Sequence, residues 1–203
     1  MTALPKDWIM KDKSLFIKNN NILILSDIHL GRFDNTTQLL ERIHNLINHF
    51  NPDILVLNGD TWNQDSFNNE NITLISELKT NVNELIIIKG NHEEKFDEFT
   101  KKFDERFKIK KEYKIDNILI HHGHHTPTQK AKHHIIGHIH PAVDGKPVYL
   151  HCDDSYYGSS VTILPMFNNV ANSLNIDYSY NYASHCPIIN DGKNLKEYNI
   201  LHT

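Results

Sequence analysis

Five short apolar runs recur along the chain, and each is followed directly by a polar cluster that contains Asp, Asn or His. Each run has the length and the branched aliphatic composition of a buried strand. The runs are Ile22–Leu25, Ile54–Leu57, Leu85–Ile88, Ile118–Ile120 and Ile135–Ile136. In an open α/β sheet, residues at the carboxyl ends of the strands face one crevice. The pattern therefore predicts a sheet that gathers carboxylates, imidazoles and one amide in a single place.

Helical patterns separate the first strand-like runs, which is typical of βαβ units and a mostly parallel sheet. Apolar spacing predicts helices over 39–50, 72–78 and 96–107, and at most a short helix over 126–132. Further on, Tyr113–Ile115 and Ile118–Ile120 predict a hairpin, and strands are expected at 148–150, 161–164 and 199–201. We expect an α/β fold, a layered α/β/β/α sandwich of two facing sheets flanked by helices. Because no repeat or Gly/Ser linker divides the chain, residues 1–203 are predicted to form one domain.

The bulk properties favour a globular protein of the cytoplasm. No apolar run is long enough to span a bilayer, and the N-terminus has no apolar signal-peptide core. Two cysteines are too few for a disulfide framework, so reduced thiols are expected. The net charge of −4 argues against a strongly electrostatic nucleic-acid binder. Fifteen histidines raise the expectation of a metal site, because imidazole is the commonest metal ligand.

The polar clusters offer oxygen and nitrogen ligands without a thiolate. Asp27 and His29 stand two apart, so they can hold one ion from neighbouring positions. Asp60 follows Gly59, and its two carboxylate oxygens can bridge two ions. The remaining candidate ligands are the Asn91 amide and the imidazoles of His122, His138 and His140. Such a donor set suits Mn, Fe, Zn or Mg better than a soft metal.

A pair of divalent ions would account for this set of candidate ligands. Ions about 3.5–4 Å apart hold the attacking and leaving oxygens of a displacement at phosphorus, and they acidify a bound water. His92, next to Asn91, is a candidate to protonate the leaving group or to stabilise charge on the phosphoryl oxygens. Glu93 is a candidate to orient the His92 ring through a hydrogen bond. Catalytic roles are thus expected for His92 and Asp60.

In this order, the clusters resemble the motifs of the calcineurin-like metallophosphoesterases: D-x-H, G-D, G-N-H-[DE], H and G-H-x-H, over residues 21–141. The resemblance implies the metallophosphoesterase fold and two metal ions, with Mn as the leading candidate and Fe, Zn, Ni or Mg as alternatives. It implies a first ion held by Asp27, His29, Asp60 and His140. The second ion is then held by Asp60, Asn91, His122 and His138, with Asp60 bridging.

The segments 137–143, 161–168 and 186–188 are similar to the SbcD-related phosphoesterases of archaea and the ligase-associated bacterial group. That resemblance implies hydrolysis of phosphodiesters, a DNA or RNA nuclease as one form of it, and a helicase or ligase as partner. A small-molecule phosphodiesterase or phosphatase is the alternative, and a non-catalytic scaffold on the same fold is a third hypothesis. A metallo-β-lactamase-type site is excluded, because His138-Ile139-His140 continues into Pro141 and not into the required Asp-His.

Three other features have a functional and a structural interpretation. Arg32 can bind a substrate phosphate or form a surface ion pair, and His124 can bind substrate or be a loop residue. The basic segment 101–114 contains Lys101, Lys102, Arg106, Lys108, Lys110, Lys111 and Lys114. It can contact a phosphate backbone, or it can be a solvated face that protects an edge strand.

Overall fold

A six-stranded sheet carries the first three polar clusters. Its order is β1-β2-β3-β4-β5-β6, and β3 through β6 run parallel. The strands are β1 (Trp8–Lys11), β2 (Ser14–Ile17), β3 (Ile22–Leu25), β4 (Ile54–Asn58), β5 (Glu84–Ile88) and β6 (Lys108–Lys110). The computed structural model describes residues 4–32, 35–63, 68–93, 108–143, 145–156 and 158–168, with short strands at 174–175, 188–190 and 194–196.

A second sheet of seven strands carries the last two clusters, in the order β16-β15-β12-β13-β9-β8-β7. Its strands are β7 (Glu112–Ile115), β8 (Ile118–His121), β9 (His133–Ile136), β12 (Tyr149–Tyr156), β13 (Ser159–Ile163), β15 (Ile188–Asn190) and β16 (Asn194–Lys196). A small third sheet contains β10 (Pro141–Val143), β11 (Lys146–Pro147) and β14 (Leu174–Asn175).

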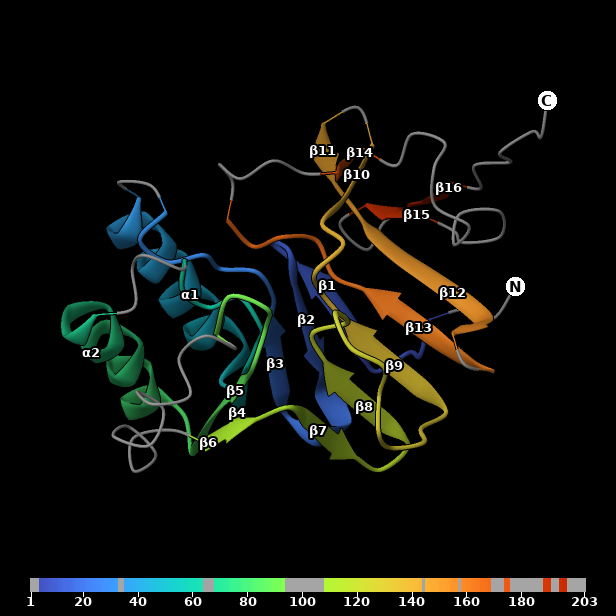
Figure 1. Ribbon diagram of the computed structural model, residues 1–203, viewed down its shortest axis with the longest axis horizontal. Coiled ribbons are helices and arrows are strands. Elements are labelled where there is room, and N and C mark those ends of the chain that lie inside the picture. The colour runs from blue at the N-terminus through green and yellow to red at the C-terminus, as the bar shows by residue number, and fades with distance from the viewer. Residues whose placement is uncertain are drawn as a thin grey trace.

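The two described α-helices, α1 (Thr36–Phe50) and α2 (Asn69–Leu78), lie on the side of the first sheet away from the second (Figure 1). Two short 3₁₀ helices are also described: η1 (Lys18–Asn20) follows β2, and η2 (Lys79–Asn81) follows α2. Helix α1 ends where predicted, because Asn51 adopts a left-handed conformation and donates its N–H to the Ile47 carbonyl. No described helix combines the length and the apolar character needed to cross a membrane.

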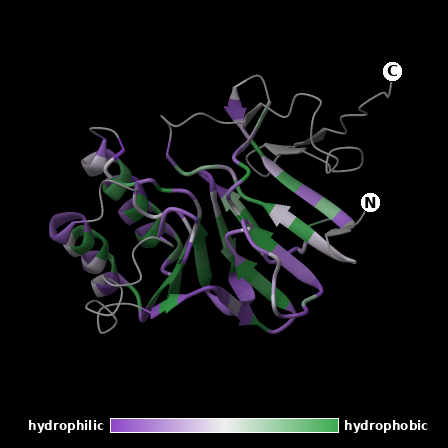
Figure 2. Cartoon of the chain, in the orientation of Figure 1, coloured by the Kyte–Doolittle hydropathy of each residue, from purple (hydrophilic) through white to green (hydrophobic). Residues whose placement is uncertain are grey.

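Two apolar clusters hold the layers together. One lies between the helices and the first sheet, and includes Leu39, Ile43, Leu55 and Ile75. The other lies between the sheets and joins residues of both, among them Ile24, Val56, Ile86, Ile120 and Ile135. The central strands of the first sheet are hydrophobic along their length (Figure 2), as burial on both faces requires.

This architecture confirms the predicted layered α/β fold, the five strand runs and the first two helices. The predicted helix over 96–107 and the strand over 199–201 lie outside the described residues. The segment 126–132 is irregular and contains no helix. The hairpin β1–β2 was not predicted, because its turn places Asp12 and Lys13 at positive φ, where Asn-Gly is the usual signal. Cys152 is disulfide-bonded, which contradicts the expectation of reduced thiols.

Candidate metal centre

All five polar clusters begin at the carboxyl end of a parallel strand. Ser26-Asp27-Ile28-His29 follows β3, Gly59-Asp60 follows β4, and Lys89 to Glu93 follows β5. His122 follows β8, and Gly137 to His140 follows β9. The two sheets face each other, so these loops meet at one edge of the molecule, as the sequence pattern predicts.

Backbone hydrogen bonds fix these loops to one another. The N–H of Asp27 donates to the Gly59 carbonyl at 3.2 Å, and the N–H of His29 donates to the Asp60 carbonyl at 2.8 Å. Across the sheets, the N–H of His138 lies 3.1 Å from Oδ2 of Asp27. The positions of Asp27, His29 and His138 therefore each depend on a neighbouring loop.

Five candidate ligands adopt a left-handed backbone conformation. They are Asp27, His29, Asp60, His138 and His140, with φ between 46° and 64°. Residues with a Cβ rarely adopt this conformation, which costs of order 1–3 kcal/mol at each position. Such strain gathers at functional sites, where the surrounding structure imposes the conformation. Here it turns five polar side chains toward one point.

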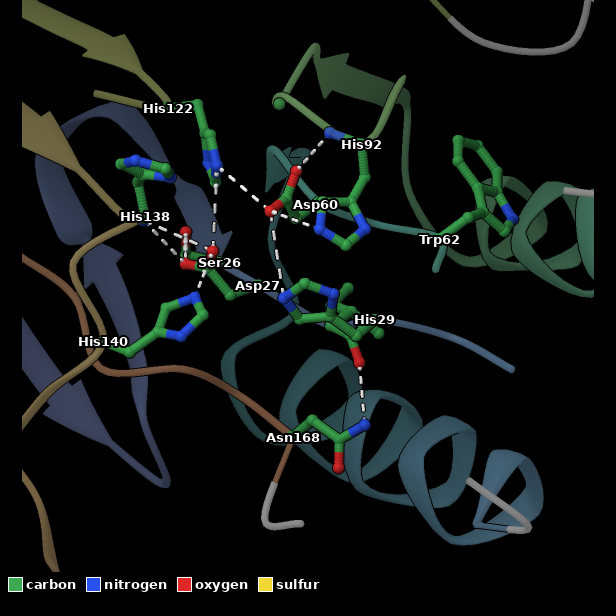
Figure 3. Close-up of polar contacts among 12 residues, drawn as sticks. Ser26, Asp27, His29, Asp60, Trp62, His92, His122, His138, His140 and Asn168 are labelled. Atoms are coloured by element: carbon green, nitrogen blue, oxygen red, sulfur yellow. Dashed lines mark hydrogen bonds and ion pairs between the residues drawn. The ribbon is translucent and has the colours of Figure 1, made fainter. Parts of the chain in front are cut away.

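Three groups of side chains in this edge have ligand atoms within 4.8 Å of one another (Figure 3). The groups are Asp27, His29 and His140; His29, Asp60 and His92; and Asp60, His122 and His138. Oδ2 of Asp60 lies 3.4 Å from Nε2 of His122 and 3.8 Å from Nε2 of His29. The Asp60 carboxylate therefore lies between two candidate ion positions.

Several buried polar atoms at this edge make no hydrogen bond within the described structure. They include both ring nitrogens of His29, Nδ1 of His92, Nε2 of His122 and Oδ1 of Asn91. A buried polar group without a partner is costly, so a native site with several of them points to a missing ligand. His29 and His122 can each offer one ring nitrogen to a divalent cation, and Asn91 can offer its amide oxygen, so the residues present fit a metal pair.

Asn58 and Ser26 support the centre, although the sequence gives no sign of either role. Nδ1 of His122 lies 3.0 Å from the Asn58 carbonyl, to which it donates, so Nε2 is the ring nitrogen that faces Asp60. The Ser26 hydroxyl donates to Oδ2 of Asp27 at 2.6 Å. Because both contacts depend on the fold, no spacing in the sequence reveals them.

Glu93 has different partners from those predicted. Its carboxylate is buried and accepts hydrogen bonds from the backbone N–H groups of Asp60 at 3.0 Å, Gly90 at 2.8 Å and Trp62 at 3.1 Å. It therefore joins the loops after β4 and β5. The predicted contact between Glu93 and the His92 ring is not among these hydrogen bonds. His92 is held through its backbone, whose N–H donates to Oδ1 of Asp60 at 3.0 Å.

The pKa values of Asp27 and His122 favour the charged form of both groups. Burial opposes ionisation of Asp27, but His122 and His140 outweigh it and hold the pKa of that carboxyl below its usual value. Burial opposes a charge on His122 as well, yet Asp27 and Asp60 raise its pKa to about 9. For His29 burial prevails, and its pKa falls to about 4. A cation binding at Nε2 of His122 would displace that proton.

The two predicted substrate-binding residues lie at the margin of the centre. The His124 ring lies 5.2 Å from the His122 ring and 6.0 Å from the His138 ring, measured between centroids. Arg32 is exposed, and its backbone N–H donates to the His29 carbonyl at 3.1 Å. Of the basic segment, residues 101–107 lie outside the described residues, whereas Lys108 pairs with Glu84 at 2.7 Å.

A family model for calcineurin-like phosphoesterases matches residues 21–142, the span that contains every cluster described above. No curated protein matches the sequence. Among solved structures, a nuclease of Pseudomonas putida named MPE is similar, with a TM-score of 0.68 and 18% identity over 89% of this chain and 90% of that chain. The Escherichia coli phosphoesterase Yfce gives a TM-score of 0.43 and 16% identity over 71% and 77% of the two chains. At 18% identity, the first likeness shows a shared fold.

Proposed function

The chain belongs to the calcineurin-like phosphoesterase family, and we propose that it is a dinuclear metal-dependent hydrolase that cleaves phosphodiester bonds. The observation that carries the proposal is the position of Asp60. Its carboxylate belongs to two of the three candidate ligand groups, one with His29 and His92 and one with His122 and His138. A single carboxylate between two sets of imidazoles is the arrangement that a shared ligand requires.

In the proposed centre, one ion is held by Asp27, His29, His140 and Asp60. The other is held by His122, His138, the Asn91 amide oxygen and Asp60. Manganese suits this mixture of oxygen and nitrogen ligands, as do iron, zinc, nickel and magnesium. When bound, such a pair supplies an acidified water and stabilises charge on the phosphoryl oxygens.

His92 has the proposed catalytic role of handling a proton. Its Nε2 lies 3.9 Å from Oδ2 of Asp60, so the ring faces the position where a phosphate would sit between the ligand groups. A proton on Nε2 would pass to the departing oxygen of the ester. Asp60 shares the proposed catalytic role, because its carboxylate lies in both ligand groups and next to the His92 ring.

For the substrate, we propose nucleic acid, cut by a nuclease of the SbcD-related type. Two observations support it. The segments 137–143 and 161–168 resemble that group, and the similar structure from Pseudomonas putida is named as a nuclease. By the same resemblance, a helicase or ligase is the proposed partner. A small-molecule phosphodiesterase is the second candidate, favoured by the net charge of −4.

A panel of esters tests the proposal. Purified protein, stripped of metal and then supplied with Mn²⁺, is incubated with bis-p-nitrophenyl phosphate, p-nitrophenyl phosphate, cyclic nucleotides, single-stranded DNA and duplex DNA. We expect metal-dependent cleavage of bis-p-nitrophenyl phosphate and of DNA. Cleavage of bis-p-nitrophenyl phosphate but not of DNA would favour the small-molecule phosphodiesterase. If no ester were cleaved with Mn²⁺, or with Fe²⁺, Zn²⁺, Ni²⁺ or Mg²⁺ supplied in its place, the protein would be a scaffold and the proposal would fail.

A further inference from the structure

A cavity of about 820 Å³ adjoins the candidate metal centre and shares His122 with it. One side is formed by Lys89, Lys110 and Lys111, and the loop after β8 contributes His124, His125 and Thr126. The volume is within the range of small-molecule sites, on the order of 300–1,000 Å³. A group held in this cavity would therefore lie next to a phosphate bound at the centre.

The lysines reach the cavity from the two neighbouring strands β5 and β6. Lys89 directly precedes the Gly90-Asn91 pair of the centre, and its backbone N–H donates to the Lys110 carbonyl at 2.8 Å. The Lys110 ammonium lies 4.7 Å from the centroid of the Tyr113 ring, so its side chain is positioned by a cation–π contact. Lys110 is thus hydrogen-bonded to the loop that contains the candidate ligand Asn91.

The carboxylate of Glu112 also lines the cavity, but its oxygens are already engaged. Oε1 accepts the Thr128 N–H at 2.6 Å, and Oε2 accepts the Thr128 hydroxyl at 2.9 Å and the Gln129 amide at 3.3 Å. Glu112 thereby fixes Thr128 and Gln129, which also line the cavity. Among the described lining residues, lysines outnumber carboxylates, and the one carboxylate is engaged, although the chain as a whole carries a charge of −4.

We propose that this cavity is a subsite for the phosphate that flanks the scissile one, so that the enzyme takes polynucleotides in preference to isolated diesters. The inference rests on the proposed phosphodiesterase and deepens it. A polynucleotide presents a second phosphate at a fixed distance along its backbone, whereas a simple diester presents none. Lysines bind such phosphates as point charges, and each contact adds a salt-dependent contribution to affinity.

The structure also supplies a matched control. Lys108 lies two residues before Lys110 on the same strand, but it pairs with Glu84 and does not line the cavity. Replacing Lys108 with Gln removes the same charge from the same strand, and it leaves the cavity lysines in place. An effect of net charge alone would therefore appear in the K108Q variant at about half the size seen in the double variant, which loses two charges.

The test compares the K110Q/K111Q double variant with wild type and K108Q. Binding of a fluorescein-labelled dT10 is measured by anisotropy with metal-free protein, over a range of salt concentrations. We expect the double variant to bind about 10-fold more weakly or worse and to lower the salt slope by about 0.7 per lost contact, with K108Q close to wild type. With Mn²⁺, the ratio of kcat/KM for dT10 to that for bis-p-nitrophenyl phosphate should fall by a similar factor.

Equal binding by the double variant and wild type, or an equal loss in K108Q, would overturn the inference. A competition arm with dTMP tests the alternative source of phosphate: if dTMP displaced dT10 at equal concentration, the cavity would be a mononucleotide site. The binding arm does not depend on catalysis. A protein that lost dT10 binding on K110Q/K111Q substitution, yet cleaved no ester, would retain the subsite and refute the proposed function alone.

Discussion

The carboxylate of Glu93 accepts a hydrogen bond from the backbone N–H of Asp60 at 3.0 Å. Through this contact a buried side chain on the loop after β5 fixes the residue that is proposed to bridge both ions. The same carboxylate accepts two further backbone N–H groups, from Gly90 and Trp62. Its effect on the centre therefore acts through the backbone.

Replacing Glu93 with Ala should destabilise the fold. It leaves three buried N–H groups without an acceptor, at about 1–3 kcal/mol each, so we expect a loss of at least about 3 kcal/mol in the free energy of unfolding. Urea unfolding in EDTA measures it without interference from metal. The E41A variant, on the exposed face of α1, is the control. A midpoint for E93A equal to that of E41A would remove Glu93 from its assigned role.

Replacing Gly59 with Ala should disrupt the centre. A Cβ there would overlap the His122 ring, and the residue has a φ of +78°. Gly158 has a nearly equal φ of +72°, but its Cβ would meet nothing within 4 Å. Because G158A carries the same backbone strain alone, the difference between the variants isolates the clash with His122. We expect G59A, and not G158A, to lose Mn²⁺ binding in a calorimetric titration. Equal metal binding by both would contradict this packing.

His92→Ala should separate catalysis from metal binding. His92 is not a proposed ligand, so metal content should persist while kcat falls by about 10²–10⁴-fold on a DNA substrate. The loss should be smaller for bis-p-nitrophenyl phosphate, because p-nitrophenolate leaves without a proton. Equal losses on both substrates would exclude proton donation and leave only charge stabilisation.

Stability should depend on pH through His133, which lies away from the centre. Burial and the neighbouring His151 lower the pKa of His133 to about 3, from an ordinary value of 6.5. The unfolded chain therefore binds this proton first, and stability should fall as pH drops from 6.5 toward 3, by up to about 1.4 kcal/mol per pH unit. We expect a shallower fall for H133Q than for H49Q, which replaces an exposed histidine. Identical slopes in urea titrations would refute this assignment.

The sequence could predict that the candidate ligands lie together, because their signals are local. Asp27, Asp60 and His122 each directly follow a strand or stand within two residues of its end, and the carboxyl ends of parallel strands necessarily converge. The supports were not predictable in this way. The Asn58 carbonyl that orients His122 belongs to a residue 64 positions away, and any residue could supply a carbonyl. Glu93 lies in a recognisable motif, but its backbone partners become visible only in the folded chain.

The proposed two-ion centre depends most directly on the bridging role of Asp60. Replacing it with Asn keeps the shape of the side chain and removes the charge that both ion positions share. The decisive measurement is metal content per chain by mass spectrometry after Mn²⁺ loading and desalting, made on the same samples as turnover of bis-p-nitrophenyl phosphate. We predict two ions per wild-type chain, and for D60N at most one ion with turnover near background. A D60N protein that kept two ions and a rate near wild type would contradict the proposed centre.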